Sequence, residues 1–194
     1  MHSGLKASVA SATAALMGIA CSGVAQAQEP VRALWKSQEI DFNYQGFTTK
    51  YTCDGLRDRV REILLELGAR RDLKAAATGC EFSGRPSPFP GVRLVIATPV
   101  EATSENIAKQ TGAAEQFPAS WRTVQLAQSG SKLRIQRGEC ELIEELRDHI
   151  FPKLGIRVIE DRTRCVPHQE SLGQPNLTVA ALVSVPQPDV AKVN

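Results

Sequence analysis

The fold is decided by two related stretches, YTCDGLRDRVREILLELGARRD at residues 51–72 and RGECELIEELRDHIFPKLGIRVI at residues 137–159. Both contain a cysteine, thirteen further residues, the pair Leu-Gly, one more residue and an arginine. A shift of 87 residues brings these positions into register without a gap. The two tryptophans of the chain, Trp35 and Trp121, precede the two stretches at nearly the same shift. The pattern predicts an internal duplication.

Each stretch predicts an amphipathic helix. In the first, Asp54 suits the amino-terminal cap, and Gly68 supplies the left-handed residue that ends a helix. In the second, Pro152 ends or kinks the helix before Gly155. Each helix carries one apolar stripe, formed by Leu56, Val60, Ile63, Leu64 and Leu67 in the first and by Leu142, Ile143, Leu146 and Ile150 in the second. A helix with a single stripe has to bury it, and we expect a sheet beneath each one.

Strand patterns flank both helices. Before the first helix, EIDFNY and FTTKYTC predict a hairpin, and after it DLKAAATGC and GVRLVIATPV predict two more strands. The second half repeats this order with RTVQLAQ, KLRIQ, IRVIEDRTRC and NLTVAALVSV. We therefore predict an α+β fold of two tandem, pseudo-equivalent ββαββ units packed as an internal dimer. The units span residues 28–100 and 119–186, and residues 101–118 connect them.

The cysteines after residue 28 predict disulfides, because an even number in an exported chain usually pairs. Four cysteines allow three pairings, and the duplication favours one of them. If the strands before and after each helix lie side by side and parallel, the crossover brings their carboxyl ends together. We therefore expect Cys53 to pair with Cys80 and Cys140 with Cys165, each bond closing one unit and stabilising it by about 3 to 4 kcal/mol.

The first 27 residues have the pattern of a secretory signal peptide. Lys6 precedes an apolar run over residues 7–20, and the small-residue triplet at 25–27 suits cleavage before Gln28. That run is shorter than the roughly 20 residues that cross a bilayer, so we expect no permanent anchor. An alternative is lipidation of Cys21, although Gly18 stands where a lipobox usually has leucine. The polar tail, residues 187–194, is expected to be mobile.

The composition excludes two classes of partner. Acids and bases are interleaved, the formal charge is +2 and aromatic residues make up 5% of the chain. Nucleic-acid and membrane-surface binding both need a concentrated cationic face, so neither is expected. The arginines around the first helix have acidic neighbours and predict a salt-bridged surface, although an acidic protein or an anionic glycan remains open as a partner.

No catalytic motif stands out, and we assign no catalytic residue, metal or cofactor. The sequence contains no glycine-rich phosphate loop, G-x-S-x-G, H-E-x-x-H or C-x-x-C. His149 follows Glu145 by one helical turn, which is typical of an exposed pair. His168 lies near Glu170 and Ser171, but neighbours on one loop rarely reach the geometry of a catalytic triad.

Function is expected in the two long loops at residues 81–91 and 166–176. Three prolines stiffen the first loop, and Phe89 has no local reason to be buried there. The candidate binding residues are Arg85, Phe89 and His168. We predict an exported, periplasmic or secreted, non-catalytic module that binds an envelope protein or polymer. Two alternatives stay open: a periplasmic enzyme, hydrolase or thiol-disulfide protein, with a site between the units, and a self-assembling structural protein.

Overall fold

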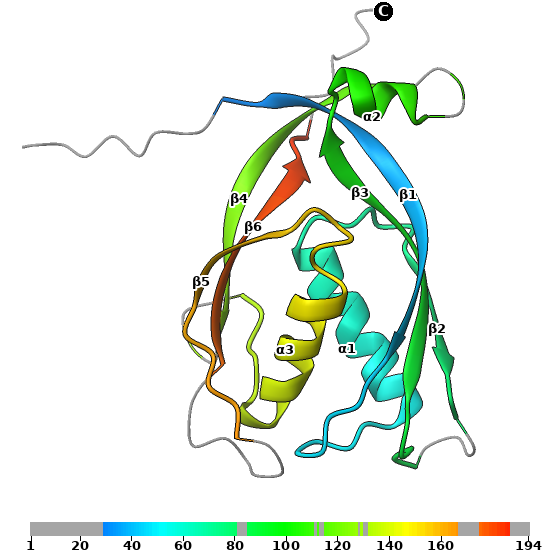
Figure 1. Cartoon of the computed structure of the whole chain (residues 1–194), viewed down its shortest axis with the longest axis vertical. Coiled ribbons are helices and arrows are strands. Elements are labelled where there is room, and N and C mark those ends of the chain that lie inside the picture. The colour runs from blue at the N-terminus through cyan, green and yellow to red at the C-terminus, as the bar shows by residue number, and fades with distance from the viewer. Residues whose placement is uncertain are drawn as a thin grey trace, which may run out of the picture.

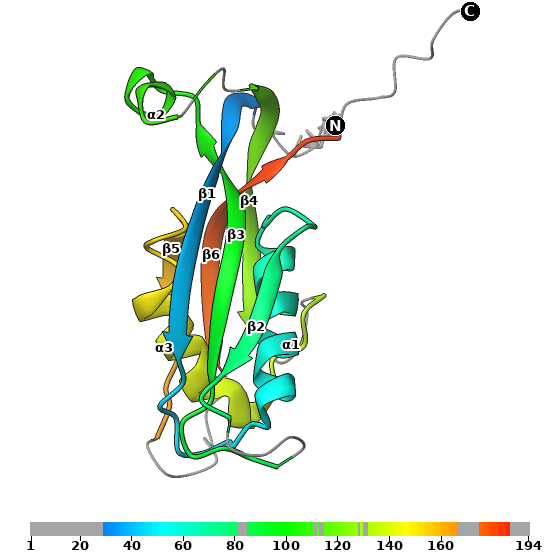
Figure 2. The same ribbon diagram turned by 90° about the vertical axis from the view of Figure 1, so that its right-hand side faces the viewer.

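The computed structural model describes residues 29–80, 85–110, 112, 115–127, 129, 132–166 and 175–186. The predicted signal peptide, with Cys21, and the predicted mobile tail lie outside the described residues. The described chain forms one six-stranded sheet that curves around two helices, as Figures 1 and 2 show. None of the described helices is both long and apolar enough to cross a membrane.

The two halves contain the same elements in the same order. The first half consists of β1 (Val31–Asn43), α1 (Cys53–Glu66), β2 (Lys74–Thr78) and β3 (Gly91–Glu101). A short helix, α2 (Ser104–Ala108), follows it. The second half consists of β4 (Phe117–Ala127), the 3-10 turn η1 (Arg137–Glu139), α3 (Cys140–His149), β5 (Arg157–Asp161) and β6 (Asn176–Ser184).

The strand order is β2-β3-β1-β4-β6-β5, and every neighbouring pair is antiparallel. Counted outward from the centre, each half places its first strand, then its third, then its second. The halves meet where β1 pairs with β4, over only three residues of each strand, Val31 to Ala33 opposite Phe117 to Ala119. By contrast, β1 pairs with β3 from Ala33 to Asn43.

The prediction of an α+β fold is confirmed, but the ββαββ unit is not. Each half has one strand before its helix, because β1 and β4 are paired along their lengths with β3 and β6. The segments FTTKYTC and KLRIQ, expected as second hairpin strands, form turns and single bridges. In the first of these segments a polar residue caps the helix instead. Thr52 Oγ1 accepts a hydrogen bond from the Gly55 amide at 3.1 Å, so Thr52 and not Asp54 is the amino-terminal cap of α1.

Both predicted disulfides are present. The Cα atoms are 6.1 Å apart in Cys53–Cys80 and 5.6 Å apart in Cys140–Cys165. The strands before and after each helix were expected to lie side by side, and this was wrong. Strand β3 lies between β1 and β2, and β6 lies between β4 and β5. Strands β1 and β2 still run in the same direction, since each is antiparallel to β3. Their carboxyl ends therefore reach the same edge of the molecule, where the cysteines follow.

One hydrophobic core joins the halves. The helices lie side by side in the concave face of the sheet (Figure 1). The predicted apolar stripe of each helix is buried. A single cluster includes residues of both helices and of all the long strands. Burial of each large aliphatic side chain contributes roughly 1.5 to 3 kcal/mol, so the shared core dominates the stability of the chain. It also makes the sheet a rigid support for the loops at its end.

Candidate binding site

An aromatic pocket lies beside the amino terminus of α1, where the loop between β2 and β3 meets the loop after β1. It has a volume of about 410 Å³ and is formed by residues 44–47, 50–51 and 87–90. Four of these residues are aromatic: Tyr44, Phe47, Tyr51 and Phe89. We call this hollow the aromatic pocket.

Two phenyl rings stand exposed at this pocket. Phe89 is 72% exposed and Phe47 is 63% exposed, the two highest values among the large hydrophobic side chains that are exposed in the described chain. Single exposed apolar residues are common on protein surfaces. Packing within the chain does not explain why two largely exposed phenyl rings line the same hollow. Their exposure favours an apolar contact with a partner.

The floor of the pocket is built from two tyrosines. The rings of Tyr44 and Tyr51 meet edge to face, with centres 5.1 Å apart. Burial raises the pKa of both phenols far above the ordinary value of 10, and the nearby carboxylate of Glu139 raises both further. Both hydroxyls are therefore protonated at neutral pH. Both hydroxyl oxygens are shielded from solvent and neither has a hydrogen-bond partner in the described chain, so they add no polar group to the surface of the pocket.

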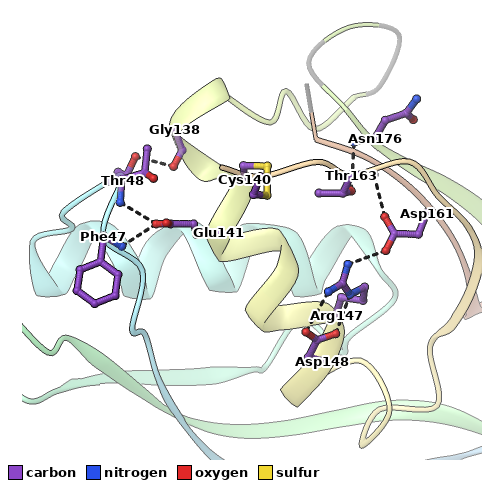
Figure 3. Close-up of a disulfide and its surroundings, with 12 residues drawn as sticks. Phe47, Thr48, Gly138, Cys140, Glu141, Arg147, Asp148, Asp161, Thr163 and Asn176 are labelled. Carbon is purple, nitrogen blue, oxygen red and sulfur yellow. Dashed lines mark hydrogen bonds and ion pairs between the residues drawn. A yellow bond between two sulfur atoms is a disulfide. The ribbon is translucent and has the colours of Figure 1, made fainter. Parts of the chain in front are cut away.

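The loop after β1 is fixed by the second half of the chain. The Glu141 carboxylate on α3 accepts hydrogen bonds from the Phe47 and Thr48 amides, at 2.6 and 2.7 Å (Figure 3). Glu145, one turn later, accepts from the Gln45 amide at 2.9 Å. The Thr49 hydroxyl donates to the Gly138 carbonyl at 2.6 Å. Phe47 is thus held in place by charge-assisted bonds from the other half of the molecule.

The Phe89 loop is fixed equally well by the first half. The Ser87 amide donates to the Tyr51 carbonyl at 3.1 Å, and the Ser87 hydroxyl donates to the Gly79 carbonyl at 2.7 Å. The Tyr44 amide donates to the Pro90 carbonyl at 2.9 Å. With the Cys53–Cys80 disulfide beside them, residues 85–90, the described part of this loop, have little freedom left to lose on binding. Both rings are presented by preorganised backbone.

The residues predicted from the sequence are only partly brought together. Phe89 lines the aromatic pocket, whereas Arg85 is exposed on the same loop but does not line it. His168 lies outside the described residues, as do residues 81–84 of the first loop and residues 167–174 of the second. His149 is exposed at the end of α3. The described part of the chain holds no cluster of three side chains suited to a metal ion.

Sequence reasoning missed Phe47, Tyr44 and Tyr51. A signal was available, because aromatic residues make up only 5% of the chain and both of its tyrosines fall in this short segment. Comparison of the chain with models of protein families, with curated proteins and with solved structures finds no match. The geometry of the molecule therefore carries the functional argument.

Proposed function

We propose that this protein is an exported, non-catalytic binding module of the cell envelope that holds another envelope protein at the aromatic pocket. The observation that carries the proposal is the pair of exposed rings, Phe47 and Phe89, at one hollow. Large rings held rigidly are efficient binding residues, since they bury much area and lose little side-chain entropy.

The proposed location follows from the amino-terminal pattern and the cysteines. A signal peptide over residues 1–27 would deliver the chain to an oxidising compartment, periplasmic or extracellular, and two disulfides within the chain are suited to such a compartment. The mass of the protein purified from its native compartment tests this. A chain that begins near Gln28 would support export with cleavage, whereas a lipid on Cys21 or an uncleaved start would contradict it.

The partner is tested by cross-linking in cells. A photoreactive phenylalanine analogue replaces Phe89 in one strain and Ile159, an apolar residue of β5 that is 56% exposed, in a control strain. We expect a discrete protein adduct from position 89 that is absent from position 159. The adduct should be lost on Phe47→Ala substitution, because both rings form the same contact surface.

Three outcomes would overturn the proposal. An adduct that is the same from both positions would reflect non-specific contact. An adduct that survives Phe47→Ala would remove the aromatic pocket as its site. An adduct with a second copy of this chain, together with self-association in sedimentation, would assign a self-assembling protein instead.

A further inference from the structure

The duplicated tryptophan and arginine meet in both halves of the molecule. The guanidinium of Arg70 lies 5.6 Å from the centre of the Trp35 ring, and that of Arg157 lies 4.0 Å from the centre of the Trp121 ring. Each pair stands beside the glycine that follows its helix, and each lines a hollow. The repeated sequence pattern thus produces two pseudo-equivalent hollows.

The two hollows differ in charge and size. The hollow at the end of α1, here the basic hollow, has a volume of about 870 Å³ and contains Arg61, Arg70, Arg71 and Lys132 against two glutamates. The counterpart hollow at the end of α3 has a volume of about 340 Å³, and one arginine, Arg157, stands there against two glutamates. A purely structural role for the repeated motif would not require this difference.

The strand register identifies the residue that makes the difference. Trp35 stands opposite Pro99, and Trp121 stands opposite Leu182. Glu101, two residues after Pro99, therefore corresponds to Ser184, two residues after Leu182. In the counterpart hollow, Glu101 accepts a hydrogen bond from Trp121 Nε1 at 3.0 Å and lies 3.9 Å from Arg157. Ser184 offers no carboxylate to the basic hollow.

The glutamates inside the basic hollow are already neutralised. Glu62 pairs with Arg59 at 2.6 Å, and Glu66 pairs with Lys132 at 3.1 Å and with Arg122 at 3.3 Å. Arg61 and Arg71 are exposed, and neither has a carboxylate within salt-bridge distance in the described chain. The hollow therefore has an excess of positive charge and offers guanidinium donors to an anion.

The lining favours one class of anion. The Trp35 ring already stacks with Phe117, with ring centres 4.7 Å apart, and the Arg70 guanidinium lies over it, so little of the ring is left to stack on a sugar. The rest of the wall includes the aliphatic side chains of Leu65, Leu133 and Val183. Carboxylates interspersed with aliphatic groups, as in an acidic peptide, match this wall better than the hydroxyl-rich surface of an acidic glycan.

We propose that the basic hollow binds an acidic peptide segment of a partner protein. Its carboxylates pair with Arg61 and Arg71, and its aliphatic side chains pack on Leu65 and Val183, which are only partly buried. The basic hollow lies at the carboxyl end of α1 and the aromatic pocket beside its amino end, about 20 Å apart at 1.5 Å per residue. The two sites are therefore separate, and either can fail without the other.

The test uses the mature protein with both disulfides intact and a fluorescent peptide, Glu-Leu-Glu-Glu-Leu-Glu, with its all-Gln analogue as the comparison. Fluorescence anisotropy should give at least tenfold tighter binding of the acidic peptide, weakening as salt is raised. Arg61→Ser with Arg71→Ser should lower the affinity about tenfold. The control, Lys74→Gln with Lys153→Gln, removes the same charge from exposed positions outside the hollow and should change the affinity by less than about twofold.

A second variant tests the comparison between the hollows. Ser184→Glu places a carboxylate at the position where the counterpart hollow has one. This variant should bind the acidic peptide about tenfold more weakly, while its thermal unfolding temperature stays unchanged. Equal binding of the acidic and all-Gln peptides would overturn the proposal, as would unchanged affinity in the Arg61 and Arg71 variant. Tighter binding of an oligogalacturonate than of the acidic peptide would overturn the choice of a peptide and assign a glycan.

Discussion

Arg59 of α1 and Glu139 of η1 form a two-bond ion pair between the halves of the molecule. Arg59 Nε lies 2.6 Å from one carboxylate oxygen and Nη2 lies 2.7 Å from the other. Their side chains are only 15% and 10% exposed. The same Nη2 donates to the Arg134 carbonyl at 2.5 Å. The guanidinium of Arg59 therefore joins α1 both to η1 and to the segment that precedes η1.

Replacing Arg59 with methionine should destabilise the protein by about 3 kcal/mol, because it leaves a buried carboxylate without its partner. Urea unfolding followed by far-UV circular dichroism measures this. Arg57→Met is the matched control on the same helix, where the ion pairs are exposed and little change is expected. Equal losses from the two variants would show that the buried pair has no special role.

The glycines that end the two helices should respond differently to substitution. Both have positive φ, 91° at Gly68 and 71° at Gly155, so alanine costs about 1 to 2 kcal/mol at either position. A Cβ at Gly68 would also lie 2.7 Å from the Leu182 carbonyl oxygen, whereas one at Gly155 would meet nothing within 4 Å. Gly68→Ala should therefore lower the free energy of unfolding more than Gly155→Ala. The prediction fails if the order is reversed or the two losses are equal.

The cluster around Arg147 should make stability depend on acid pH. Hydrogen bonds from Arg147 lower the pKa of Asp148 (Figure 3). At Asp161, burial acts to raise the pKa, but hydrogen bonds from Thr163 and Arg147 outweigh it and the pKa falls. Because both folded pKa values lie below the ordinary 3.8, this stabilisation is complete above that pH. It is lost as the pH falls through the lowered values.

Comparison with Arg147→Met separates the contribution of this cluster from that of the groups on which Arg147 does not act. Burial raises the pKa of Glu144 and of Glu145 and acts on stability in the opposite direction. The contribution of Glu145 cancels in this comparison, whereas Arg147 also acts to lower the pKa of Glu144 and so adds to the difference with the same sign. The difference in unfolding free energy between the parent protein and Arg147→Met should be largest at pH 6 and should shrink towards pH 2.5. A difference that stays constant over this range would exclude the proposed linkage.

The predictable part of the fold was the part set by local sequence. The helical stripes, the glycine stops and the cysteine spacing each depend on a few neighbouring residues, and all were confirmed. The extra hairpin strands failed because alternating residues such as those before Thr52 suit a strand and a capping loop alike. Whether β1 pairs with β3 or with a nearer segment depends on the competition between distant strands, which periodicity does not reveal.

The candidate site was predictable to a similar extent. Phe89 was identified because a large ring in a proline-rich loop needs an explanation. Phe47 was assigned to a strand, and the carboxylates that fix its loop come from a helix 94 residues later in the chain. Likewise the sequence showed the repeated tryptophan and arginine as a pattern but not their contact. That only one hollow has a carboxylate beside its tryptophan could be recognised only from the strand register.

The outer strands of the sheet bear on whether this protein could polymerise. Both are five residues long, and β5 has a register shift between Val158 and Glu160 and bears charges at Arg157 and Asp161. Short, irregular and charged borders are the features by which natural sheets prevent strand addition from a neighbouring molecule. Lateral growth of a fibre through backbone pairing is therefore disfavoured, at β2 by the shortness of the strand and at β5 by its shortness, register shift and charges.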